Sequence, residues 1–174
     1  MMSITADYLG MGLRLDDLDG ENVAYFKHCA EHSFHLQQCD DCKLKRYPPT
    51  TACPWCMSRE AQWVPVEGKG AVHSYTEVHH AIQPAFRAHV PYLILLVDLD
   101  AQKGKPTTEE ALRVVGNLVA PDGTLAPPDL VKTVGIGTRV RMVFSDVSPG
   151  LSLPQWAIDE GAKQPDEPWR YPQE

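Results

Sequence analysis

Hydrophobic and polar residues alternate along several short segments in the second half of the chain. In residues 71–79, the even-numbered side chains from Val72 to Val78 lie on one face of an expected strand, and His73, Tyr75 and His79 lie on the other. Further strands are expected at 92–99, 112–120 and 139–147, with a short helix at 127–134; Gly, Pro and Asp clusters separate these segments. Short strands joined by turns predict a small antiparallel barrel.

The segment before these strands has apolar residues at a helical spacing. Apolar residues recur at spacings of three and four, at Val23, Phe26, Ala30 and Phe34. This spacing predicts an amphipathic helix over residues 21–36. Cys29 lies within the same pattern and is expected to be a small core residue.

The other four cysteines form two Cys-x-x-Cys units with ten residues between them, at Cys39, Cys42, Cys53 and Cys56. Two such turns facing each other across a hairpin present four thiolates in the tetrahedron that zinc prefers. Protein atoms then fill every coordination position, which favours a structural site over a catalytic one. Iron is the main alternative, because a four-sulfur site accepts either metal, and a redox-active pair of thiols is another. Lys43 and Met57 occupy positions where such turns often have glycine.

Composition and charge narrow the possible partners. The 174 residues carry a formal charge of −7, and 43% of them are hydrophobic, which is enough for a packed core. The charge divides among four expected units, namely residues 1–36 (−4), 37–62 (+1), 63–148 (−1) and 149–174 (−3). None of them is basic enough to neutralise many phosphates, so nucleic-acid binding is kept only as a second class of function. Tyr75 and Tyr92 are the aromatic residues on which bases would stack.

No segment of the sequence predicts contact with a membrane. The longest aliphatic run, Leu93 to Val97, is far shorter than a membrane-spanning helix. Residues 1–20 lack the basic start and apolar stretch of a secretory signal. The expected location is therefore the reducing cytoplasm.

Five prolines interrupt the last 26 residues, which also contain Trp156 and Trp169. Such a segment is not expected to form long regular structure. Two interpretations stay open: a disordered acidic tail, or an arm that wraps around a partner, because tryptophan is enriched at interface hot spots.

The order of motifs is more specific than any one of them. It comprises the helix, the first cysteine pair, Tyr47-Pro48-Pro49, the second pair, Trp63, Gly68-Lys69-Gly70, Val72-His73-Ser74-Tyr75-Thr76, Val90-Pro91-Tyr92, Gly137-Thr138-Arg139-Val140 and Val143-Phe144. Over residues 20–148 this order resembles the DUF35 family, whose members join a rubredoxin-like zinc ribbon to an OB-fold. The resemblance implies a mainly β chain: an N-terminal segment with a helix (1–36), a zinc ribbon (37–62), a five-stranded OB-fold barrel (63–148) and an acidic tail (149–174).

The resemblance also implies a function. DUF35 proteins usually accompany acyl-CoA enzymes, particularly thiolases and MaoC-type enoyl-CoA hydratases, in degradation of steroid side chains and aromatic compounds. The large subunit carries the catalytic residues in such assemblies. This chain would then be the non-catalytic partner of a thiolase-like subunit, or of a MaoC-like one, in a hetero-oligomer whose substrate is a coenzyme A ester.

Two further groups of residues are candidate sites. His28, Glu31 and His32 match the His-x-x-Glu-His pattern of inverted zinc peptidases, and His35 would extend the same helix face. A polar helix face explains this five-residue match more simply, since the motif counts only in its structural context.

The second group lies in the loop between the first two barrel strands, where OB-folds often bind ligands. It contains Phe86, Arg87 and His89. A guanidinium such as that of Arg87 binds phosphates and carboxylates in a fork, so the loop is a candidate contact for acyl-CoA. The alternative is an ordinary solvated loop charge.

Overall fold

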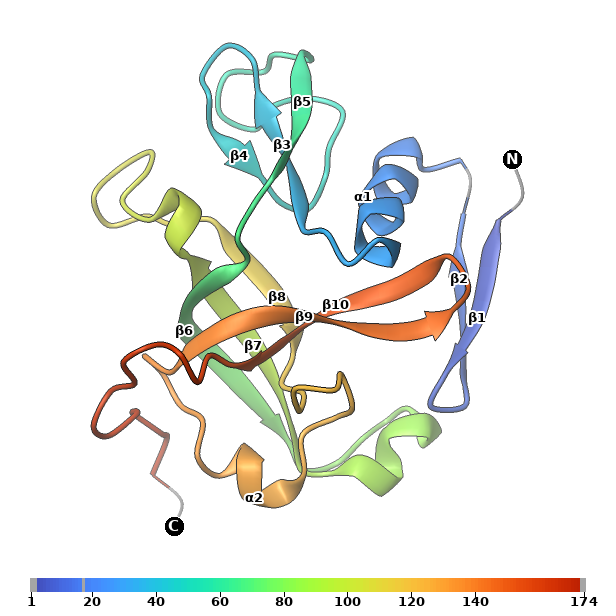
Figure 1. Ribbon diagram of the computed structural model, residues 1–174, viewed down its shortest axis with the longest axis vertical. Helices are drawn as coiled ribbons and strands as arrows, with labels where there is room; N and C mark the ends of the chain where they lie inside the picture. The colour runs from blue at the N-terminus through green and yellow to red at the C-terminus, as the bar shows by residue number, and fades with distance from the viewer. Residues whose placement is uncertain (1–2, 17, 173–174) are drawn as a thin grey trace.

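The computed structural model describes residues 3–16 and 18–172, which form an N-terminal hairpin, a helix, a small three-stranded sheet and a five-stranded barrel (Figure 1). The hairpin strands are β1 (Ile4–Tyr8) and β2 (Met11–Leu15), followed by helix α1 (Gly20–Ala30). The small sheet contains β3 (His35–Cys39), β4 (Lys45–Arg46) and β5 (Ala61–Pro65). The barrel strands are β6 (Lys69–Val78), β7 (Tyr92–Leu99), β8 (Arg113–Asn117), β9 (Arg139–Ser148) and β10 (Leu151–Ile158). Short helical turns are η1 (Pro84–His89), η2 (Asp100–Gln102) and α2 (Pro128–Val131).

The barrel has the strand order of an OB-fold. Its antiparallel sheet runs β10-β9-β6-β7-β8, and a parallel bridge between Leu118 and Trp156 brings the two end strands together. Alternate residues of β7, from Leu93 to Leu99, are fully buried inside it, as is Trp156. The expected mainly β fold is confirmed, and the strand expected at 92–99 has the observed bounds.

A bulge in β6 corrects the expected faces of that strand. Val72 pairs with Val97, but Ser74 already pairs with Leu96, so one extra residue sits between them. An extra residue exchanges the two faces of the strand beyond it. Tyr75 therefore packs against the core, while the exposed His73 lies outside it, and the expectation that these two residues share a face is wrong.

The segment after residue 148 is more regular than its prolines suggest. β10 pairs with β9 from Leu151 to Ile158 and includes Pro154. A proline cannot donate a ladder hydrogen bond, but an end strand of a sheet tolerates it on the unpaired side. The remaining residues, 159–172, form an arm that returns to the barrel, where Ile136 and Trp169 form an isolated β-bridge.

Helix α1 is shorter than its apolar periodicity predicts. The helix ends at Ala30, and His32 adopts a left-handed conformation with φ of +53°. The chain then turns, and Phe34 enters the core from outside the helix. Asp19 caps the start of the helix, because its side chain accepts a hydrogen bond from the backbone N–H of Asn22.

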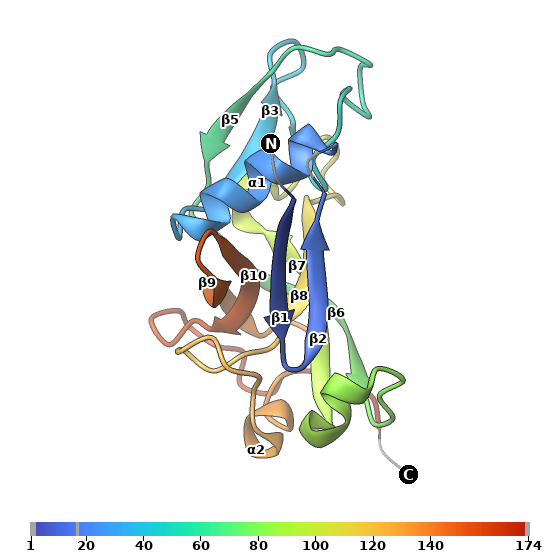
Figure 2. The ribbon, with the colours of Figure 1, turned by 90° about the vertical axis from the view of Figure 1, so that its right-hand side faces the viewer.

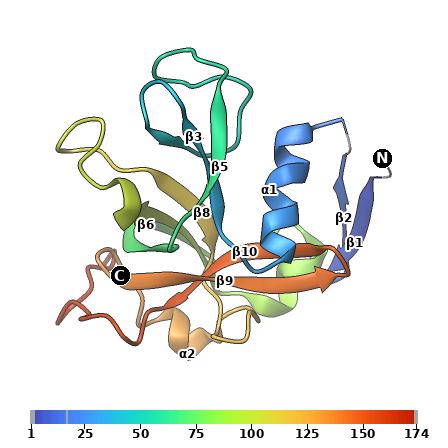
Figure 3. The same ribbon diagram turned by 45° about the horizontal axis from the view of Figure 1, so that its top comes forward.

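Helix α1 lies between the small sheet and the N-terminal hairpin (Figures 1 and 3). Its buried residues Tyr25 and Cys29 join the main core, which confirms the expected role of Cys29. The hairpin itself was not expected; it turns at Leu9 and Gly10, both with positive φ, and stands along one side of the barrel (Figure 2).

None of the helices within the described ranges is long and apolar enough to cross a membrane.

Candidate metal centre

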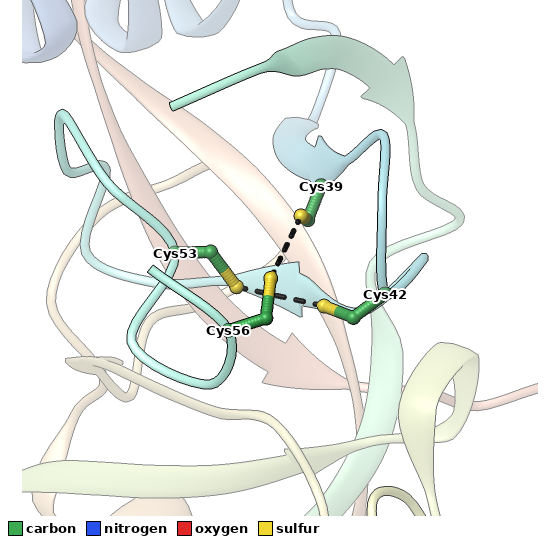
Figure 4. Close-up of side chains that lie close together, drawn as sticks. All are labelled: Cys39, Cys42, Cys53 and Cys56. Atoms are coloured by element: carbon green, nitrogen blue, oxygen red, sulfur yellow. Dashed lines mark hydrogen bonds between the residues drawn. The ribbon is translucent and has the colours of Figure 1, made fainter. Parts of the chain in front are cut away.

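Four cysteine sulfurs meet at the tip of the small sheet (Figure 4). Cys39 ends β3 and Cys42 follows it in the first turn, while Cys53 and Cys56 come from the second turn, before β5. The Sγ atoms of Cys39 and Cys56 are 3.5 Å apart, as are those of Cys42 and Cys53. All four lie within 4.8 Å of one another, so the structure brings together the four ligands expected from the sequence.

The two turns share one backbone geometry. In the first, the N–H of Lys43 donates to the carbonyl of Cys39, and the N–H of Cys39 donates to the carbonyl of Leu44. In the second, Met57 and Ser58 take the corresponding places around Cys53. Lys43 and Met57 both have a left-handed backbone, with φ of +63° and +66°. These are the two positions where the sequence suggested that glycine would be usual.

The donor set fits a tetrahedral metal ion. Four sulfurs about 2.3 Å from zinc lie about 3.8 Å from one another at the corners of a tetrahedron. The observed separations, from 3.5 Å to at most 4.8 Å, bracket this edge length. Four thiolates leave no coordination position for water or substrate, so an ion held here would stabilise the fold of the surrounding turns. The same sulfurs would accept iron.

Backbone N–H groups favour the thiolate form of two of the four cysteines, whereas burial and hydrogen bonds with neighbouring thiols raise the pKa of Cys42 and Cys56. The N–H of Cys42, together with that of Asp41, lowers the pKa of the Cys39 thiol to about 6. Burial raises the pKa of Cys53, but the N–H groups of Trp55 and Cys56 more than offset it, and its pKa is also lowered. A low pKa favours the thiolate, which is the form that binds metal.

A buried polar network connects the two turns, and no sequence motif marks it. Arg46 is buried; its Nε donates to Oε1 of Gln37 at 2.8 Å, and another nitrogen donates to the carbonyl of Thr50 at 2.9 Å. The N–H of Thr50 donates to the same Gln37 oxygen. This network holds the chain that leads into the second turn. Its members are distant in sequence and match no motif, so nothing in the sequence pattern indicated it.

The histidine motif of α1 does not form a site. His28 stacks on the ring of His35 at a centroid distance of 4.0 Å, and burial lowers the pKa of His28. His32 lies beyond the end of the helix and contacts Oδ1 of Asp146 at 2.6 Å instead. The expected face with His28 and His32 one turn apart is therefore wrong, because the left-handed His32 ends the helix.

The three candidate residues of the loop between β6 and β7 lie in turn η1, and each has a different environment. Phe86 packs between Tyr8 and Tyr92, with centroid distances of 5.9 Å and 5.2 Å. Arg87 is exposed. His89 lines a cavity of about 410 Å³ that also contains Tyr8.

Tyr75 and Tyr92, the candidate residues for base stacking, pack against other residues of the protein. Tyr92 packs on Phe86, and Tyr75 packs against the core with the Arg170 guanidinium 5.4 Å from its ring centre. Both rings already have packing partners within the protein, which argues against their use as stacking platforms for bases.

Comparisons with known proteins extend this description. A family model for the C-terminal OB-fold domain of ChsH2 matches residues 63–145. A probable enoyl-CoA hydratase alpha subunit from Thermomonospora curvata is 32% identical over 137 residues, which is 79% of this chain but only 37% of that relative. This chain therefore spans little more than a third of the length of that relative.

Two other similar proteins are matched over most of their length. A DUF35 domain-containing scaffold protein from Methanocaldococcus jannaschii is 31% identical over 136 residues, covering 77% of this chain and 84% of the relative. Among solved structures, a chain of the Ltp2-ChsH2(DUF35) aldolase has a TM-score of 0.63 and 30% identity, covering 82% of this chain and 98% of that one. A DUF35 protein from Sulfolobus solfataricus shares the fold with a TM-score of 0.50 and 13% identity, covering 81% of this chain and 87% of its own. With the cysteine cluster and the OB-fold barrel in place, these matches show that the chain belongs to the DUF35 family.

Proposed function

We propose that this protein is a metal-binding, non-catalytic subunit of a hetero-oligomeric acyl-CoA enzyme. The observation that carries the proposal is the similarity to a chain of the Ltp2-ChsH2(DUF35) aldolase over 98% of that chain. The hydratase alpha subunit and the scaffold protein among its relatives support the same type of role. The catalytic groups of the complex would then lie on the partner chain.

The metal centre is consistent with a non-catalytic role for this chain. A closed four-sulfur site, whether it holds zinc or iron, supplies folding free energy and no open position for substrate. In this proposal the ion fixes the fold of the small sheet, and the barrel presents a shaped surface to the catalytic subunit.

The reaction of the complex depends on the partner. A thiolase-like partner is our first candidate and would cleave a β-oxoacyl-CoA with coenzyme A, or run the reverse reaction. A MaoC-like partner would hydrate an enoyl-CoA, and the hydratase relative supports that alternative. The name of the structural neighbour adds an aldolase partner as a third candidate. In an acyl-CoA complex, we propose that such a partner would cleave a β-hydroxyacyl-CoA.

Turn η1 is our candidate contact for the acyl-CoA within such a complex. Arg87 is exposed and can reach a phosphate, while the neighbouring Phe86 is fixed by its packing on Tyr8 and Tyr92. His89 would line the adjoining cavity. Replacement of Arg87 by Ala should weaken acyl-CoA binding by the complex without changing its assembly, measured by titration of the complex with acyl-CoA. Equal affinity and turnover in the variant would contradict this contact.

The test of the whole proposal is purification of the tagged protein from its native cells, with mass spectrometry of any chain that co-elutes in a fixed ratio. The partner, expressed alone and with this chain, is then assayed for β-oxoacyl-CoA cleavage, enoyl-CoA hydration and β-hydroxyacyl-CoA cleavage. We expect one activity that is present in the complex and reduced in the isolated partner. A lone metal-loaded protein with no partner would contradict the proposal.

A further inference from the structure

One edge of strand β6 lacks a neighbouring strand over half its length. β6 pairs with β7 from Gly70 to Val78, but with β9 only from Lys69 to Ala71. The backbone of Val72 still bonds to residues 137 and 138. Beyond that point, within residues 3–16 and 18–172, no strand pairs with this edge of β6. An edge of this kind presents backbone groups that can accept another strand.

The C-terminal arm runs beside this edge without pairing with it. Arg170 forms an ion pair with Glu77 at 2.6 Å, and the N–H of Tyr171 donates to the side-chain oxygen of Tyr75 at 2.9 Å. Both contacts are made by side chains of β6, so the arm forms no backbone hydrogen bonds with this strand through them. A cavity of about 380 Å³ remains between the two, lined on the β6 side by Ser74 and His79 among others.

The opposite wall of this cavity includes two exposed aromatic rings carried on a fixed backbone. Trp169 is 53% exposed and Tyr171 is 75% exposed. Their backbone is fixed, because Trp169 bridges to Ile136 and Arg170 donates to the carbonyls of Val131 and Val134. Tryptophan and tyrosine side chains have only two rotatable bonds, so on a fixed backbone they lose little entropy on binding, which suits them as anchors at an interface.

An apolar surface continues from the edge across the outside of the sheet. Ser74 and Tyr75 also line a second hollow of about 220 Å³, together with Ile94, Leu96 and Val115. Val115 is 47% exposed, although it lies on a barrel strand. The edge of β6 therefore lies between the outer face of the sheet and the exposed rings of the arm.

The charge around the edge favours an uncharged occupant. Glu77 is the acidic residue of the cavity, and it is neutralised by Arg170 and lies 3.4 Å from His79. A basic or acidic segment would find no unpaired opposite charge there. A nucleic-acid strand would likewise find no basic groove for its phosphates.

We propose that an extended, uncharged and apolar segment of the catalytic subunit adds to the edge of β6 as a further strand, with its side chains against Trp169 and Tyr171. This inference rests on the proposed function for the identity of the partner. Backbone hydrogen bonds to the alternate residues of 74–78 whose N–H and C=O groups point away from β7 would provide the affinity, and the two hollows would select the side chains.

The direct test places a charge at the edge. Ser74 is exposed and lines both hollows, and an edge lysine is a natural obstacle to strand addition. We expect S74K to weaken binding of the purified catalytic subunit at least tenfold, and Trp169→Ala to do the same by removing an anchor. The matched control is Gln62→Lys, an exposed position on β5, which is an end strand of the small sheet. This control should bind like the unmodified protein.

Hydrogen exchange provides a second measurement that does not depend on a variant. Within residues 74–78, the backbone amides that point away from β7 should exchange more slowly when the catalytic subunit is bound, whereas those of β5 should not change. Unchanged affinity in both variants, or unchanged exchange in β6 in a complex that does form, would overturn this inference and leave the proposed function intact. Failure of the unmodified protein to form any stoichiometric complex would overturn both.

Discussion

Two residues of the metal centre adopt a backbone conformation that costs free energy. Lys43 and Met57 have φ near +65°, where the Cβ of any L-residue other than glycine is crowded. Both side chains are exposed, so their removal sacrifices little packing. We expect Lys43→Gly and Met57→Gly each to stabilise the metal-loaded protein by about 1 kcal/mol, measured as the free energy of unfolding in denaturant.

Alanine is the matched control at the same positions. Lys43→Ala removes the same side-chain atoms beyond Cβ but keeps the crowded Cβ, so it should leave the free energy of unfolding nearly unchanged. If alanine and glycine had equal effects, relief of backbone strain would not be the cause.

At the residue scale, the sequence was informative where the chemistry is local. The four cysteines could be assigned because each pair is brought together by a turn of its own residues. The histidine motif misled because its geometry depends on a helix continuing past Ala30, and the left-handed His32 ends it. The contact of His32 with Asp146 joins residues 114 positions apart, which no local pattern could indicate.

At the scale of elements, the short turn η2 joins the barrel to the small sheet. Gln102 is buried, and its side chain forms hydrogen bonds with the backbone N–H of Lys45 at 2.6 Å and with its carbonyl at 3.0 Å. Asp100, in the same turn, forms an ion pair with Arg139 of β9. One three-residue turn therefore fixes β4 relative to β9.

Loss of the Gln102 side chain should weaken the connection between β4 and the barrel. In Gln102→Ala both backbone groups of Lys45 lose their partner, and we expect a loss of about 1–3 kcal/mol in the free energy of unfolding. Faster hydrogen exchange at Lys45 would locate the effect. As a comparison, Asp100→Asn should have a smaller effect, because that carboxylate is partly exposed to solvent. Equal losses in the two variants would contradict a specific role for Gln102.

The elements themselves were predictable to different degrees. Strands with a strong apolar pattern, such as β7, were found with correct bounds because burial alone determines them. β10 was missed because Pro154 and its neighbouring prolines masked a strand that its pairing with β9 stabilises. The residues of β6 after His73 face the opposite way from what alternation predicts, because a bulge lies at this position. The alternation of residue types does not reveal a bulge.

At the scale of the molecule, one hydrophobic core joins α1, the small sheet and the barrel. Tyr25 of α1 contacts Tyr47 and Trp63 at centroid distances of 5.9 Å and 6.5 Å, and it belongs to the same core as the barrel residue Trp156. The two cysteine turns extend beyond this core, and within the described ranges Trp55 and Met57 at their tip are largely exposed. The turns thus have little apolar packing of their own.

Removal of the metal should therefore unfold the turns and leave the barrel folded. With a strong chelator, we expect rapid hydrogen exchange in residues 39–60 and retained protection in β7, whose core residues are fully buried. Cys39→Ser should reproduce this state without chelator, because three sulfurs no longer complete the tetrahedron. Cys29→Ser is the matched control, since that thiol lies in the core outside the metal centre, and it should retain one metal ion per chain by elemental analysis. Complete unfolding on chelation would show that the ion also stabilises the barrel, whereas unchanged exchange in the turns would contradict a structural role for the metal.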